Sequence, residues 1–151
     1  MTIRNICLLS ILGMLLTFTF TGKPSDAQSI HEFKIHVDVT SNDENTKSLV
    51  QSWIKREFRG LGDVRIVSFD DASYILSLVV VEPVYEATGR KTGSIAIARE
   101  FALRSFTNPH LYHRSHLGLQ TGNTENLERL CKKLVAGIDT DNLESVRELF
   151  Q

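Results

Sequence analysis

The chain has 151 residues, 42% of them hydrophobic and 23% charged, with a formal net charge of −1. This length is typical of one domain that buries a core of its own. The near-neutral charge argues against a general nucleic-acid binder, so we expect no nucleic acid among its partners.

The N-terminal segment has the layout of a signal peptide. Arg4 supplies a positive charge, and a largely apolar run of 15 residues follows from Ile6 to Phe20. As a helix this run would span about 22 Å, which is less than the ~30 Å hydrocarbon core of a bilayer. A polar, helix-breaking stretch then ends at Ala27, which predicts cleavage after that residue. An uncleaved membrane anchor is the alternative.

We therefore expect residues 1–27 to be a signal peptide and residues 28–151 to be a single domain. The processed protein would be periplasmic or secreted and would not span a membrane. Cys7 lies within the apolar run, away from a cleavage box, so no lipid-anchor cysteine is expected. Only Cys131 would remain after cleavage, which leaves no partner for an intramolecular disulfide.

The first half of the domain predicts a strand followed by a helix. Apolar and polar residues alternate from Phe33 to Val39, as in a half-buried strand. Ser41 and Glu44 have the spacing of a capping box, so a helix should begin there and end near Arg59. Its apolar stripe, which we expect to bury the tryptophan against the sheet, consists of Leu49, Val50, Trp53, Ile54 and Phe58.

A long β-hairpin is predicted in the middle of the chain. After a short strand over residues 63–68, apolar runs extend over 74–81 and 92–103, separated by a connection rich in turn residues. The first run is apolar on both faces, which predicts that both faces of the sheet are covered or nearly so. The stretch from His110 to Leu119 is compatible with either an edge strand or an ordered loop.

Two helices are predicted at the C-terminal end, one over residues 124–138 and a short one after Asp141. The complete order is β-α-β-β-β-(β)-α-α. The fold class is therefore α+β, with a mostly antiparallel sheet of four or five strands. One N-terminal and two C-terminal helices should pack on that sheet.

Three histidines recur every third residue and are candidate metal ligands: His110, His113 and His116. On a regular strand His113 would point away from the other two, and no nearby carboxylate or thiol completes a site. A polar exposed edge is the simpler interpretation. Whether these residues come within ligand distance of one another and of His36 would decide between the two.

Three arginines could bind an anionic group or a partner, since guanidinium groups suit phosphate and carboxylate: Arg99, Arg104 and Arg114. Scattered strand charges facing water are the alternative. Cys131 lies within the apolar stripe of the helix over 124–138, where a small buried thiol is usual. No motif for a catalytic residue or a cofactor is found, so we expect no enzymatic activity and no cofactor.

The stretch Asp71-Ala72-Ser73-Tyr74-Ile75-Leu76 opens the hairpin. With the preceding strand, helix and short strand, it resembles small bacterial envelope domains over roughly residues 33–103. The families that it resembles are the lipopolysaccharide-assembly lipoproteins and the N-terminal domain of TolB-type proteins. The lipoprotein members carry an anchor cysteine, which this sequence lacks. The resemblance implies a binding or assembly module without chemistry of its own.

The leading hypothesis is thus an exported, non-enzymatic binding or assembly module of the bacterial cell envelope. Its partner would be another envelope protein or envelope component. A small-ligand or metal-binding periplasmic protein that uses the segment from His110 to His116 is the alternative. A small hydrolase with a site assembled from dispersed residues is the third hypothesis.

Overall fold

A computed structural model of the chain describes residues 32–105 and 112–150. These residues belong to one compact unit, His31–Gln151. The expected signal peptide and His110 lie outside the described residues. The side chains of Tyr112, Arg114 and Ser115 are likewise not described, although their backbone positions in a strand are.

The centre of the domain is a five-stranded sheet in the order β2-β1-β3-β4-β5. β1 runs parallel to both β2 and β3, whereas β3, β4 and β5 are antiparallel neighbours. The strands are β1 (Phe33–Ser41), β2 (Val64–Ile66), β3 (Tyr74–Val81), β4 (Ser94–Arg104) and β5 (Tyr112–Asn123).

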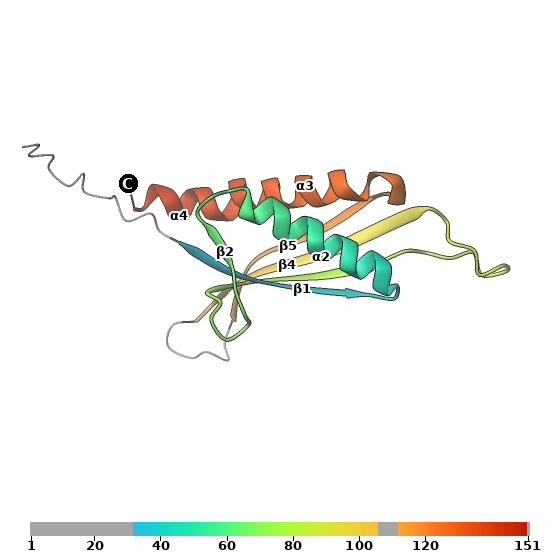
Figure 1. Cartoon of the computed structure of the whole chain (residues 1–151), viewed down its shortest axis with the longest axis horizontal. Helices are drawn as coiled ribbons and strands as arrows, with labels where there is room; N and C mark the ends of the chain where they lie inside the picture. Colours follow the sequence, from blue (N-terminus) through green and yellow to red (C-terminus); the bar gives the residue numbers. More distant parts are fainter. Residues whose placement is uncertain (1–31, 106–111, 151) are drawn as a thin grey trace, which may run out of the picture. The chain divides into compact units, whose positions relative to one another are not determined.

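The helices are α2 (Glu44–Arg59), α3 (Leu127–Ile138) and α4 (Glu144–Glu148). A 3-10 turn, η2 (Thr124–Asn126), leads into α3, and a π turn, η3 (Asp139–Leu143), leads out of it. Figure 1 shows α2 and α3 next to each other on one side of the sheet, where they contact one another. The α+β class, the element order and the dominance of antiparallel pairing are confirmed. The stretch from His110 to Leu119, for which two interpretations were open, contains an edge strand.

The helix-facing side of the sheet forms the dry core. Every second residue of β1 and β3 is buried there, and the apolar stripes of α2 and α3 cover them. The parallel pairing of β1 with β3 places Ile35 beside Tyr74 and Val37 beside Leu76. The fully buried side chains of greatest volume in this layer include Phe33, Phe58, Phe101, Ile54 and Leu134.

The second face of the sheet carries no helix among the described elements, so the prediction of two covered faces is wrong. Val79 and Val81 on β3 are 48% and 46% exposed. The apolar run in β3 suggested coverage because strands buried on both faces read in the same way. In β3, one set of alternate residues packs against the helices, and much of the other set faces away from them.

The N-terminus of α2 is capped differently from the prediction. The cap is Asp43, whose side chain accepts a hydrogen bond from the Thr46 amide at 2.8 Å. Ser41 is the last residue of β1, and its hydroxyl accepts from the Asp43 amide. The capping box between Ser41 and Glu44 is therefore wrong by two residues, because β1 continues further than its alternating pattern indicated.

The side chain of Arg147 connects the C-terminal helix α4 to the sheet through ion pairs. The Arg147 guanidinium donates to both carboxylate oxygens of Asp63, with an Nη2–Oδ1 distance of 3.0 Å, and pairs with Asp139 at 2.7 Å. It also lies over the Phe33 ring, 5.4 Å from the centroid. Hydrogen bonding to Asp63 raises the pKa of Arg147. This cluster ties the C-terminal helix to the strand preceded by Asp63.

Trp53 should contribute less to the free energy of unfolding than its place in the apolar stripe suggested, because its side chain is only partly buried. Phe58, one turn later on α2, is fully buried. We expect Phe58→Ala to lower the free energy of unfolding by about 3–5 kcal/mol and Trp53→Ala to cost clearly less. Urea denaturation of both variants checks this, and an equal or larger loss for Trp53→Ala would contradict the assigned packing.

Helix capping by Asp43 should be visible in the pH dependence of stability. The Thr46 amide and then Lys91 lower the pKa of Asp43 to about 2, from 3.8 in the unfolded chain. The charged form therefore stabilises the fold above about pH 4, and that contribution fades as the pH falls towards 2. The difference in thermal midpoint between wild type and Asp43→Asn should shrink between pH 5 and about pH 2. Asp38→Asn, which alters an exposed carboxylate that caps no helix, should show a smaller change in this range.

Candidate functional site

The candidate anion-binding arginines are not brought together. Arg99 is the register partner of Leu78 and faces the helices, whereas Arg104 lies at a position of the opposite face. Arg104 donates to the carbonyls of Phe69 and Asp70, at 3.2 and 2.6 Å. The backbone of Arg114 pairs with Ala102. Arg99 and Arg104 therefore cannot form one anion site, and the interpretation as exposed strand charges is also wrong for Arg99.

Arg99 is a buried cation inside the helix-facing layer, with a side chain that is only 9% exposed. Its guanidinium donates to the Leu134 carbonyl at 3.1 Å and to the His116 Nε2 at 2.9 Å, and Asp141 lies 4.0 Å away. Its Nε is buried without a hydrogen-bond partner in the described structure. Because guanidinium N–H groups only donate, the ring nitrogen of His116 that faces Arg99 acts as an acceptor.

Two glycines make room for this arginine. A Cβ at Gly118 on β5 would lie 2.6 Å from the Arg99 Nε, and a Cβ at Gly137 on α3 would lie 3.2 Å from its Nη1. The guanidinium therefore fills a slot between the edge strand and the helix above it. This arrangement is a structural joint, since Nη1 and Nη2 of Arg99 donate to acceptors on α3 and β5.

The histidines are arranged differently from the expectation for a regular strand. A register shift between Phe101 and Ala102 inserts one extra residue in β5, so His116 pairs with Phe101 and His113 with Leu103. Both positions are therefore on the helix-facing side, and the prediction that His113 points opposite His116 is wrong. His113 is exposed, and His116 contacts Arg99. Within the described residues, no group of three histidine, cysteine or acidic side chains is placed to hold a metal ion.

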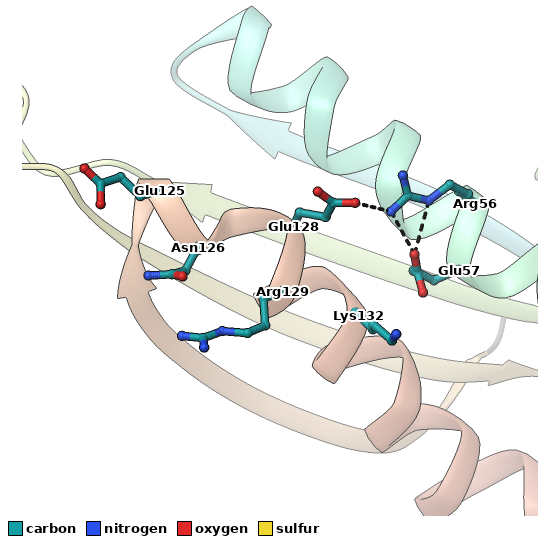
Figure 2. Close-up of a pocket in the computed structure, with 7 residues that line it drawn as sticks. All are labelled: Arg56, Glu57, Glu125, Asn126, Glu128, Arg129 and Lys132. Carbon is teal, nitrogen blue, oxygen red and sulfur yellow. Dashed lines mark hydrogen bonds and ion pairs between the residues drawn. The ribbon is translucent and has the colours of Figure 1, made fainter.

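A shallow groove of about 360 Å³ runs between α2 and α3. Figure 2 shows the side chains that line it, among which Arg56 on α2 bridges Glu57 and Glu128. The Arg56–Glu128 pair raises the pKa of Arg56. Charges of both signs alternate along the groove and Arg56 pairs with two of them, as is usual for a solvated helical surface. The groove lacks an apolar floor and is a weak candidate for a ligand site.

A second hollow among the described residues, of about 220 Å³, lies on the side of the sheet that carries no described helix. Its lining combines the Phe69 ring with Ile75 and Ala102 as an apolar floor, and with Ser77 and Glu100 as polar groups. Two contacts hold the loop that carries Phe69. The His36 Nδ1 donates to the Val67 carbonyl at 3.2 Å, and the Arg104 guanidinium stacks over the Phe69 ring at 5.7 Å.

Beside this hollow, apolar side chains form a row across three strands. The register aligns Val79 on β3 with Ala98 on β4 and Leu119 on β5. Leu119 is 70% exposed and the neighbouring Leu117 is 61% exposed. We call this surface, made of Val79, Val81, Ala98, Leu117 and Leu119, the open face. Exposed apolar side chains that adjoin one another are typical of an interaction surface, whereas isolated ones are not.

The connection between β3 and β4 extends the apolar character of β3. Its exposed residues include Val84 and Tyr85, which are 52% and 58% exposed. The base is fixed by Lys91, which pairs with the nearly buried Glu82 at 2.7 Å and with Asp43 at 3.0 Å. These carboxylates, Glu82 first, raise the pKa of Lys91. Lys91 thereby links the base of the hairpin to the residue that caps α2.

Cys131 is fully buried in the stripe of α3, and burial raises the pKa of its thiol to about 12. A thiol in this state is a poor nucleophile. Its predicted packing position is confirmed, and its lack of reactivity stays a prediction. Sequence reasoning missed the open face, although the alternation of Leu117 and Leu119 with polar residues and glycine was visible.

No family model matches this sequence, and no curated protein matches it either. Solved structures that match this chain include the following three. Protein XCC0632 from Xanthomonas campestris, associated with the DUF330 family model, is 11% identical, with 82% of this chain and 94% of that chain covered and a TM-score of 0.55. A PelC dodecamer from Paraburkholderia phytofirmans is 21% identical, with 75% and 90% covered and a TM-score of 0.47. A minor lipoprotein from Acinetobacter baumannii is 12% identical, with 76% and 89% covered and a TM-score of 0.30.

Of these three, XCC0632 supports a shared fold, and at its level of identity it supports the fold alone. The fold of this chain is thus similar to that of this one bacterial protein. The finer resemblance to lipopolysaccharide-assembly lipoproteins and TolB-type domains is not confirmed. Within residues 32–105 and 112–150, no helix is long and apolar enough to cross a membrane.

We expect the protein to bind no transition metal tightly. Titration calorimetry with Zn²⁺, Cu²⁺ and Ni²⁺ near neutral pH should show at most weak surface binding. Replacement of the two described histidines of β5 should change the free energy of unfolding by different amounts, because only His116 accepts a hydrogen bond from Arg99. His116→Ala should lower the free energy of unfolding by about 1–3 kcal/mol, and the matched His113→Ala by less than about 0.5 kcal/mol. Stoichiometric submicromolar metal binding that is lost in the double variant would contradict this assignment.

Proposed function

We propose that this protein is an exported, non-enzymatic binding or assembly module of the bacterial cell envelope. The observation that carries the proposal is the open face, on which a row of apolar side chains crosses three strands of a rigid sheet. The partner is another envelope protein that lays an apolar surface of its own against Val79 and Leu119. Periplasmic or secreted location is part of the proposal and rests on the signal-peptide layout of residues 1–27.

The arrangement of charges favours a protein partner over a small ligand. Asp38 and Glu100 lie in the register row next to the apolar row, and Lys34 and His36 lie further along β1 on the same face. An apolar centre with a polar margin is how protein interfaces are built. A small-molecule site encloses most of its ligand, whereas the hollow beside Phe69 is shallow and open.

The absence of enzymatic activity is also proposed, and the chemistry of the described residues supports it. Two of the buried ionisable groups among the described residues, Arg99 and Cys131, are directed into packing contacts. Catalytic groups need a reactive atom that is accessible to a substrate and oriented by a neighbour. Neither of these two side chains meets that requirement.

Site-specific photocrosslinking tests the proposed surface. The full-length protein would carry a benzophenone side chain at Val79, with a matched position at the exposed Lys132 on α3. In the envelope fraction of the source bacterium, Val79 should yield an adduct with a protein other than this chain, and Lys132 should not. Binding of that purified protein should weaken at least about tenfold in Val79→Asp, and remain unchanged in Lys132→Asp.

Two results would overturn the proposal. Equal adduct yields at both positions would show that the open face is not selected as a binding surface. Retention of the protein in the cytoplasm would contradict the proposed role in the cell envelope.

A further inference from the structure

The two edge strands of the sheet, β5 and β2, differ in length. β5 is 12 residues long, and within the described structure its only strand neighbour is β4. The opposite edge is β2, which has three residues. Short edge strands limit unwanted pairing, whereas a long one presents a row of unpaired backbone groups.

The direction of these backbone groups follows from one hydrogen bond. The Thr124 amide donates to the Gly93 carbonyl at 2.9 Å, immediately beyond the register pair of Ser94 with Asn123. In an antiparallel ladder, alternate residues bond to the same neighbour. Even-numbered residues of β5 after the bulge therefore bond to β4, and the N–H and C=O groups of Leu117, Leu119 and Thr121 point outward.

The same stretch has none of the usual devices that prevent pairing. From His116 to Asn123 it contains no lysine, no acidic residue and no proline. The bulge at Ser115 precedes the stretch and leaves it regular. The exposed Leu117 and Leu119 stand on the edge itself. An uncharged, apolar edge with free donors and acceptors favours addition of another strand.

We propose that a second copy of this chain occupies this edge, so that β5 pairs with β5 in antiparallel orientation. A two-fold axis through Leu119 places Leu119 opposite itself and Leu117 opposite Thr121. Three residue pairs then exchange about six main-chain hydrogen bonds. Because none of these residues is charged, a self-complementary pairing brings no like charges together.

The pairing also continues the open face. A two-fold axis perpendicular to the sheet keeps the same face of each copy on the same side. The apolar row of Val79, Ala98 and Leu119 in one copy would then meet the same row in the other. The product is a ten-stranded sheet with an open face about twice as wide as that of one copy. This self-association is separate from the proposed binding of another protein.

Sedimentation equilibrium of the full-length protein tests the inference. Wild type should dimerise at concentrations up to about 100 µM, and Leu119→Lys should raise the dissociation constant at least about tenfold. Thr121→Pro should do the same, because it removes an outward N–H while leaving the bonds to β4 intact. Val79→Lys is the matched control on the same face, two strands away from the edge, and should leave the dimer unchanged.

Disulfide trapping gives a second measurement. In the proposed register the two Leu119 Cα atoms lie about 5.5 Å apart, which suits a disulfide. Mild oxidation should therefore link Leu119→Cys into dimers, while Thr40→Cys, exposed on β1, should stay monomeric. Both variants retain the buried Cys131 and also Cys7, so the native thiols are the same in the pair.

Three outcomes would overturn the inference. A wild type that stays monomeric would leave the edge without a second copy, whether or not another protein binds the open face. Loss of the dimer in Val79→Lys but not in Leu119→Lys would indicate face-to-face stacking. Efficient linkage of Thr40→Cys would indicate contact without a specific register.

Discussion

Burial of only one face of the sheet is the constraint on which the rest of the structure depends. The helix α2 crosses over from β1 to β2, and β3 then pairs with the other side of β1 in the same direction. The helix α3 returns to the side of the sheet that α2 covers (Figure 1). Along each strand, one set of alternate residues therefore faces the helices and the other set faces the side without described helices. Leu76 and Phe101 enter the core, whereas Val79 and Ala98 remain at the surface. A surface of this kind exists only because no second helical layer covers it among the described elements.

The buried Arg99 links this core to the edge strand. Burying a guanidinium is costly unless acceptors replace its water. The Leu134 carbonyl and His116 provide acceptors from two different elements, and Gly118 and Gly137 leave the space that it needs. The joint therefore links β5 and α3 through a side chain of β4. A rigid edge loses less conformational entropy when another strand pairs with it.

The same geometry produces the two surfaces to which we assign roles. The row on the open face follows from the register between β3, β4 and β5, and the outward backbone groups follow from the phase of the ladder between β4 and β5. Leu119 belongs to both surfaces. A partner that binds the open face would therefore contact a region that also borders the second copy, which couples assembly to binding.

The sequence by itself determined the α+β class, the strand at Phe33, the apolar stripe of α3, most of the stripe of α2 and the buried place of Cys131. Leu49, which the sequence assigned to the α2 stripe, is 48% exposed. These features depend on local periodicity, which a linear pattern records. Only the tertiary structure decided that Arg99 is buried, that His113 and His116 share a face, and that β3 is covered on one side. Each of these depends on residues far apart in the chain: the glycines opposite Arg99, the extra residue in β5, and the side of the sheet on which both helices pack. A strand's own sequence cannot specify such neighbours, because alternation shows that two faces differ and not what lies against each of them.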